Sequence, residues 1–203
     1  MDYWATEEAT AGLLKHMNCS WEEARARLHI DSPHTVWGRY VGPTPPPGED
    51  IWGLRHRKIH HGTGDYWEVE NHPLATFRTV KEIEAHYCFP SPDDWDYSHL
   101  ARDIQGKEDR PLRGGGSEPF LTYKDLRGHE QAYMDLAENP DIVHFVLDRL
   151  FDLAYQGTLR IFEAIPGKVL VSYVAEDLGG QNGLLFSLRH IREFLLPRMK
   201  RMM

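Results

Sequence analysis

The sequence is poor in cysteine, in positive charge and in long apolar runs, and each shortage excludes a class of protein. Its two cysteines, Cys19 and Cys88, stand far apart and outside any CxxC pattern, so they offer neither a disulfide framework nor a zinc knuckle. Lysine and arginine total 23 against 31 aspartates and glutamates, and the net charge of −8 argues against nucleic acid or an anionic membrane as partner. Because no apolar run approaches the ~20 residues that cross a bilayer and the N-terminus lacks a signal-peptide pattern, we expect a soluble cytoplasmic protein.

The short motifs of nucleotide and hydrolase sites are also missing. Gly179-Gly180 fits neither a GxGxxG dinucleotide fingerprint nor a GxxxxGK[ST] phosphate loop, and no GxSxG elbow occurs. His56, His60 and His61 invite a metal site, but their segment alternates like a strand, where four residues span about 13 Å. We therefore assign no metal to these histidines.

With 203 residues and 41% hydrophobic content, the chain is large and apolar enough to form one domain. Helix signals occur at several points along it. Capping boxes at Ser20 and Thr79 predict helices that begin directly after them. Asn139-Pro140 predicts the start of a long helix that continues to about Ala164. Between the two capping boxes, residues 35–72 alternate aromatic and β-branched with polar residues, which predicts strands and hairpins that we interpret as an insertion.

The run VLVSYVA, residues 169–175, gives the clearest strand signal. Its nearly continuous apolar character is typical of a buried parallel strand. A polar loop follows, and Ser187 then caps a final helix in which Pro197 introduces a kink. Helix, buried strand, polar loop and helix in this order are typical of an α/β barrel or a doubly wound sheet.

The loop after this strand contains the first candidates for a site, since loops at the carboxyl ends of parallel strands face the active site. Glu176 and Asp177 are the catalytic candidates, and Gln181 and Asn182 are candidates for substrate contact. Two adjacent carboxylates can raise one another's pKa, orient a substrate or coordinate a cation. The alternative is that Asp177 helps to turn the chain while Glu176 is solvated.

A second acidic pair stands near the N-terminus. Residues 2–5 resemble a short strand, and Glu7 and Glu8 follow it at the start of a helical pattern. In a barrel they would share the same pocket, and Glu7 is a candidate for substrate contact. Acidic residues in a first helical turn also complement the helix dipole without any ligand.

Several segments together resemble the divergent branch of the uroporphyrinogen decarboxylase superfamily, which also contains cobalamin-dependent methyltransferases. The resemblance covers essentially the whole chain, and its most specific part is the EDLGGQ block with the following REFLLPRMKRM helix. The remaining segments are D-I-W-G around Trp52, HPLA from His72, the turn FPSPDDWDY and LRG from Leu126. The resemblance implies a (β/α)8 barrel and adds Trp52 as a further substrate contact.

The resemblance implies an enzyme, and it leaves the reaction open. A decarboxylase of this family needs no cofactor, and a pocket carboxylate such as Asp177 would stabilise the electron-deficient intermediate while CO2 leaves. However, the family's carboxylate-binding arginines are replaced here by ATEEAT, so Glu7 and Glu8 make a tetra-acidic porphyrinogen doubtful. The alternative is methyl transfer from a corrinoid protein with a zinc-activated thiol acceptor. A non-catalytic, partner-binding subunit is a third interpretation.

The length of the chain does not match a closed barrel. A (β/α)8 barrel takes ~250 residues, and the family's later HxCG segment, which supplies zinc ligands in methyltransferases, has no counterpart here. We therefore interpret residues 1–203 as the N-terminal part of one barrel domain with an insertion at about 35–72, inactive alone. A second copy or a partner would complete the barrel.

Overall fold

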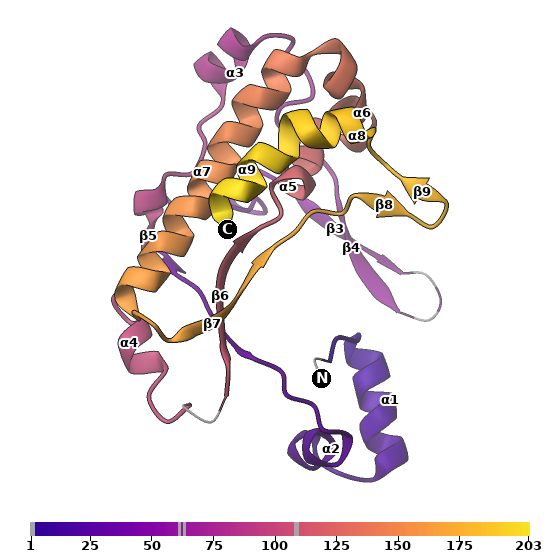
Figure 1. The fold of residues 1–203 in the computed structure, drawn as a ribbon. Helices are drawn as coiled ribbons and strands as arrows, with labels where there is room; N and C mark the ends of the chain where they lie inside the picture. Colours follow the sequence, from indigo (N-terminus) through magenta and orange to yellow (C-terminus); the bar gives the residue numbers. More distant parts are fainter. Residues whose placement is uncertain (1–2, 61, 63, 108–109) are drawn as a thin grey trace.

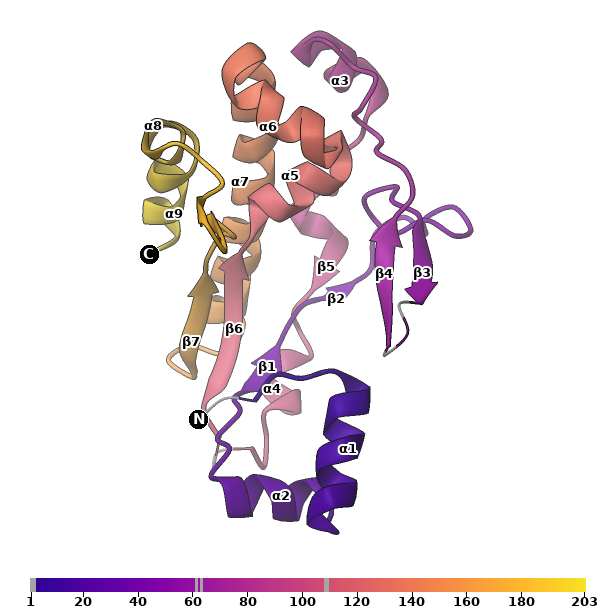
Figure 2. The ribbon, with the colours of Figure 1, turned by 90° about the vertical axis from the view of Figure 1, so that its right-hand side faces the viewer.

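The computed structural model describes residues 3–60, 62, 64–107 and 110–203, and a small parallel sheet lies at its centre (Figure 1). The sheet has the order β1-β6-β7, formed by His34–Val36, Leu112–Ser117 and Val169–Val174. All its pairs are parallel: His34 lies opposite Leu112, and Leu112 opposite Val169. Figure 2 shows the three strands side by side. The fold is therefore mixed α/β, and three strands alone do not close a barrel.

One face of the sheet is covered by the long helix α7, Pro140–Ala164. Its buried positions recur every three or four residues, as expected for an amphipathic helix; they are Ile142, Val143, Val146, Leu147, Leu150, Phe151, Thr158 and Ile161. Thr158 and Ile161 lie directly over the glycines of β6. The helix predicted from Asn139-Pro140 is confirmed at both ends.

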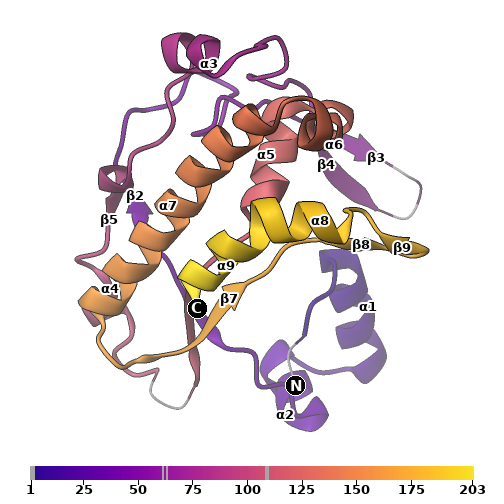
Figure 3. The same ribbon diagram turned by 45° about the horizontal axis from the view of Figure 1, so that its top comes forward.

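A helical layer packs around the first half of α7 and contains most of the hydrophobic core. It consists of α5 (Pro119–Arg127), α6 (His129–Glu138), α3 (Val80–His86) and the C-terminal α8 (Leu188–His190) and α9 (Leu196–Met202). Figure 3 shows α9 alongside α7, where Arg198 and Arg201 pair with Asp148 and Asp152. Ile191–Leu195 between α8 and α9 is a π-helical turn, and Pro197 follows it in the first turn of α9.

Shorter helices and strands lie around the parallel sheet and the helical layer. The chain begins with α1 (Glu7–Met17) and α2 (Trp21–Leu28), and α4 (Leu100–Asp103) precedes β6. The described residues also form three two-stranded antiparallel sheets: β2 (Arg39–Tyr40) with β5 (Trp95–Asp96), β3 (His56–His60) with β4 (Asp65–Val69), and β8 (Gly179–Gly180) with β9 (Gly183–Leu184). In the part of the chain that the structure describes, no helix is long and apolar enough to cross a membrane.

Both capping boxes are confirmed, with Ser20 and Glu23 starting α2 and Thr79 and Glu82 starting α3. The hairpin signal is confirmed by β3 and β4, although the same stretch also contributes β1 to the parallel sheet.

Two other expectations were wrong. Residues 3–5 form no strand, and residue 2 lies outside the described residues. The predicted parallel strand at Val169 exists as β7, but it is not buried, because it is the edge of the sheet and Leu170 is 76% exposed.

A buried ion pair ties the helical layer together. Arg127 Nε donates to Asp135 Oδ2 at 2.6 Å, and both side chains are fully buried. Arg127 Nη1 also donates to the carbonyls of Leu74 and Phe77. Asp135 accepts four further bonds, from Arg127 Nη2, Tyr123 Oη, Gln131 Nε2 and Asn139 Nδ2. Burial works to raise the pKa of Asp135, but these hydrogen bonds outweigh it and hold the pKa below its usual value.

We predict that Arg127→Met lowers the free energy of unfolding by about 3–5 kcal/mol at pH 7, because it leaves the Asp135 carboxylate buried without its cation. Since folding lowers the pKa of Asp135, the ionised carboxylate stabilises the folded wild type at neutral pH, and this stabilisation is lost as the pH falls through the lowered pKa. Urea denaturation followed by circular dichroism measures the effect. The control is Arg57→Met, which removes the exposed pair with Glu68 and should change little. Equal effects for both variants would contradict the prediction.

Candidate functional site

A cavity of about 780 Å³ lies along β6, from Ser32 and Pro33 before β1 to Ser117 and Glu118 at the carboxyl end of the parallel sheet. It is lined by side chains that follow or end two strands, Trp37 after β1 and Ser117 and Glu118 at the end of β6. Arg113 and Tyr173 reach it from within β6 and β7. The carboxyl edge of a parallel sheet is where α/β proteins bind their ligands.

A glycine run shapes the floor of this cavity. The register of β6 against β7 shifts between Arg113 and Gly116, so the strand contains a bulge. Gly115 and Gly116 adopt φ values of 71° and 120°, which L side chains rarely adopt. A Cβ on Gly116 would stand 2.0 Å from the carbonyl oxygen of Tyr173. Thr158 of α7 fixes the bulge by accepting a hydrogen bond from Gly116 N at 3.0 Å.

Ser117 is the most unusual polar group in this cavity. Its side chain is 8% exposed, and its Oγ is buried without a hydrogen-bond partner among the described residues. Its carbonyl accepts from Ala175 N at 3.1 Å, which holds the ends of β6 and β7 together. A buried hydroxyl without a partner is costly unless a ligand or water satisfies it. A water or a ligand group that reached Oγ from the cavity would satisfy this hydroxyl.

Glu176 caps a helix and does not line this cavity. Its Oε1 accepts from Phe120 N at 2.9 Å, in the first turn of α5. Burial raises the pKa of Glu176 to about 7, the neighbouring Glu118 raises it further, and the Phe120 N–H and Lys124 oppose the shift. Glu176 is therefore not solvated, and burial rather than Asp177 is the main cause of its raised pKa. With this pKa, the carboxyl can exchange a proton near neutral pH.

The other candidates from this loop lie on the surface. Asp177 is exposed and lies near Tyr133, whose pKa is raised by burial and, to a lesser extent, by this carboxylate. Gln181 and Asn182 form the exposed turn between β8 and β9, which projects from the body in Figure 1. The predicted polar loop is thus a short hairpin. It is anchored by Phe186, whose ring contacts that of Phe120 at 4.7 Å between centroids.

Glu7 and Trp52 lie apart from this loop. Glu7 is exposed in the first turn of α1, where Thr6 supplies the N-cap, an arrangement that the helix dipole alone accounts for. Trp52 packs against the main hydrophobic core, and its carbonyl accepts from Tyr87 Oη at 2.9 Å. Neither residue lines the cavity beside β6.

The position of Ser117 and Glu118 at the end of a strand is a sequence signal for this cavity, although the loop after β7 gives a stronger one. The strand β6, Leu112–Ser117, ends in this cavity. Ser117 and Glu118 end this strand just as Glu176 and Asp177 follow β7, so the same rule would have selected them. Arg113 and Tyr173 lie within β6 and β7, so a rule that selects residues at the end of a strand does not select them.

A metal does not fit the described residues. Across the described part of the chain, no three His, Cys, Asp or Glu side chains gather where they could hold an ion. His60 instead bonds Asp65 at 2.7 Å, and Cys19 and Cys88 are both free thiols. His61 lies outside the described residues.

We predict that Glu176→Gln removes a pH dependence of stability. Folding raises the pKa of Glu176 from its usual 4.5 to about 7, so its contribution is fully present below about pH 4.5 and is lost as the pH rises through 7. At pH 8 the variant should therefore be more stable than the wild type by roughly 3 kcal/mol, and the two should converge at pH 4. Urea denaturation at both pH values measures this. Asp177→Asn is the control, and a gain of the same size from it would refute the prediction.

Comparisons with known proteins yield a likeness of fold. No family model matches the chain, and no curated protein matches it. Among solved structures, a methyltransferase from Methanosarcina mazei is similar to it, with a TM-score of 0.54 and 17% sequence identity. The match covers 89% of this chain and 50% of that chain, so this chain spans about half the length of the structure that it resembles. At this identity the likeness concerns the fold.

Proposed function

We propose that the chain forms part of a (β/α)8 barrel enzyme that transfers a methyl group, with the cavity beside β6 as part of its substrate site. The observation that carries the proposal is the parallel β1-β6-β7 sheet with a cavity near its carboxyl edge, in a fold similar to that of a methyltransferase. Residues 1–203 would then be the N-terminal part of the barrel, with the hairpins between β1 and α3 as an insertion.

The edge strand β7 supports an incomplete barrel. Leu170, Val171 and Tyr173 are 76%, 39% and 52% exposed, and Leu184 in the following hairpin is 55% exposed. An apolar strand edge of this kind is normally paired or covered. Further strands of the same barrel, from a longer chain, a second copy or a partner, would cover it.

The residues of the cavity suit a substrate that carries an anionic and a hydrogen-bonding group. The Arg113 guanidinium is a fixed cation, the Ser117 hydroxyl offers a donor or an acceptor, and Trp37 and Tyr173 offer flat apolar surfaces. Glu118, whose charge would repel a second carboxylate, stands beside them. This mixture favours a substrate with few acidic groups over a tetra-acidic porphyrinogen, so we do not propose decarboxylation of a tetrapyrrole.

Zinc has no place in the chemistry that we assign to these residues, because the described part of the chain holds no suitable ligand cluster. Glu176 has a different role in the proposal. Its carboxyl has a pKa of about 7 but does not line the cavity, so it would exchange a proton with a substrate through an intervening group, and Asp177 stays a candidate for the same task.

The test of this proposal is selective binding by residues 1–203. Equilibrium dialysis against methylcobalamin, as methyl donor, and against uroporphyrin, as a stable tetra-acidic probe, should give saturable binding of methylcobalamin alone. Trp37→Ala, at a half-exposed position, should weaken this binding about 10-fold by removing an aromatic contact. The matched control is Trp67→Ala, on the exposed β4 strand, which should leave binding unchanged. Binding of uroporphyrin without methylcobalamin would favour the decarboxylase, and binding of neither would refute the proposed site.

A further inference from the structure

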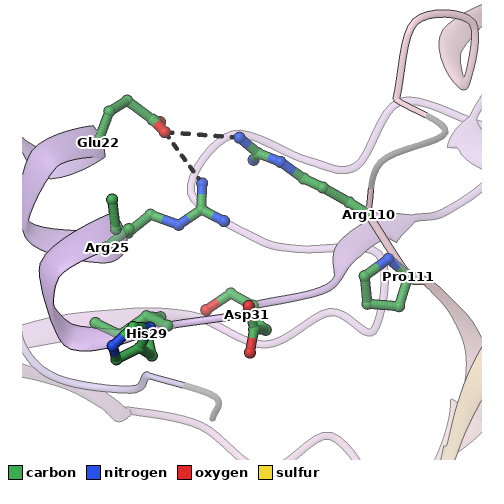
Figure 4. A pocket seen from close by; sticks show the side chains of 9 residues that line it. Glu22, Arg25, His29, Asp31, Arg110 and Pro111 are labelled. Atoms are coloured by element: carbon green, nitrogen blue, oxygen red, sulfur yellow. Dashed lines mark hydrogen bonds and ion pairs between the residues drawn. The ribbon is translucent and has the colours of Figure 1, made fainter.

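A second cavity, of about 300 Å³, lies at the opposite edge of the sheet (Figure 4). Its walls are α2, the segment that joins α2 to β1, and Arg110-Pro111, which leads into β6. His34 N bonds the carbonyl of Pro111 at 2.9 Å, so these walls meet at the amino ends of β1 and β6. The cavity thus lies at the amino edge of the sheet, and it shares Ser32 with the cavity beside β6.

Two arginines converge on one carboxylate oxygen in this cavity. Glu22 Oε2 lies 3.3 Å from Arg25 Nη1 and 3.6 Å from Arg110 Nη2, as the dashed lines in Figure 4 show. Paired guanidinium groups are the usual means of holding a phosphate or carboxylate. The Glu22 oxygen therefore stands where an oxygen of an anionic ligand would stand.

Glu22 does not exhaust the donors of Arg25. The Arg25 side chain is 12% exposed, and its Nε is buried with no hydrogen-bond partner among the described residues. A guanidinium presents five N–H donors, whereas Glu22 provides one oxygen at the long distance of 3.3 Å. Because Glu22 engages Nη1 at this long distance, an anion with more oxygens would satisfy the terminal N–H groups of Arg25 better than Glu22 does.

Glu22 is also easily displaced. Its side chain is 70% exposed and lies in the first turn of α2, where the helix N-terminus favours an acid without any partner. An exposed ion pair of this kind contributes little to stability. Glu22 can therefore leave the arginines at little cost when a stronger anion arrives.

The remaining walls suit hydroxyl groups. Asp31 lines the cavity beside the two arginines, and His29 lines it from the end of α2. A carboxylate accepts several hydrogen bonds, and an imidazole offers one nitrogen as donor and one as acceptor. A bare dianion would meet repulsion from Asp31, whereas a ligand with hydroxyl groups beside its phosphate would use Asp31 as an acceptor.

We propose that this cavity binds the phosphate monoester of a small polyol. The phosphate lies between Arg25 and Arg110 in place of the Glu22 carboxylate, and the hydroxyl groups lie against Asp31 and His29. The site is independent of the methyl-transfer proposal, because it shares neither arginine with the cavity beside β6.

The test uses residues 1–203 and glycerol 3-phosphate as the probe, with glycerol and sulfate at matched ionic strength as comparisons. Isothermal titration should show saturable binding of glycerol 3-phosphate, at least 10-fold tighter than that of sulfate. Arg25→Gln and Arg110→Gln should each weaken it 10-fold or more, since each removes a charged hydrogen bond. Glu22→Gln should tighten it several-fold, because the competing carboxylate is gone. Arg57→Gln, which removes an arginine paired on the exposed β3–β4 hairpin, is the matched control and should leave binding unchanged.

Each result decides the proposal. Because Glu22 is exposed, Glu22→Gln should fold normally, so its affinity remains informative even if Arg25→Gln unfolds. Tighter binding by Glu22→Gln together with loss in Arg110→Gln supports the site. No saturable binding by the wild type, equal loss in Arg57→Gln, or weaker binding by Glu22→Gln would each overturn it.

Discussion

The buried pair of Arg127 and Asp135 is the interaction on which the helical half of this fold depends. Arg127 belongs to α5, Asp135 to α6, and their shared hydrogen bonds reach the carbonyls of Leu74 and Phe77 and the Asn139 side chain before α7. Two charges without water are stable only when nearly every donor and acceptor is used, as is the case here. The pair thereby fixes the positions of α5 and of the start of α7. Because α5 begins directly after β6, and α7 covers one face of the sheet, the pair also positions the end of β6 and the covering face of α7.

The sheet separates two kinds of chemistry. Near its carboxyl edge, the glycine bulge of β6 brings Arg113, Ser117 and Tyr173 to one cavity, and Glu176 caps α5 behind it. At its amino edge, two arginines share Glu22. Both places have a buried polar atom without a partner among the described residues, Ser117 Oγ and Arg25 Nε. Such atoms are rare in folded proteins and mark where a ligand would improve the local energetics.

Local signals in the sequence predicted the elements with strong caps or long periodicity. The capping boxes at Ser20 and Thr79, the start of α7 at Pro140 and the strand β7 were all predictable, because neighbouring residues alone determine them. The burial of β7 was not predictable, because a strand at the edge of a sheet has the same apolar sequence as a central one. The sequence signals did not predict α5, α6 or the Arg127–Asp135 pair. An ion pair between residues eight apart can be recognised only once both helices are packed. The candidate Glu176 was selected by its place after β7, but its burial and its bond to Phe120 depend on α5.

The proposal that residues 1–203 form part of a barrel depends on the exposed apolar edge at β7. Multi-angle light scattering on the purified chain, with a thermal melt, tests it most directly. The exposed apolar residues of β7 should make the chain dimeric or aggregated, and Leu170→Lys should reduce the association, whereas Met134→Lys, on the exposed side of α6, should not. A monodisperse wild-type monomer with a sharp, cooperative melt would contradict the account, because the edge at β7 would then need no cover.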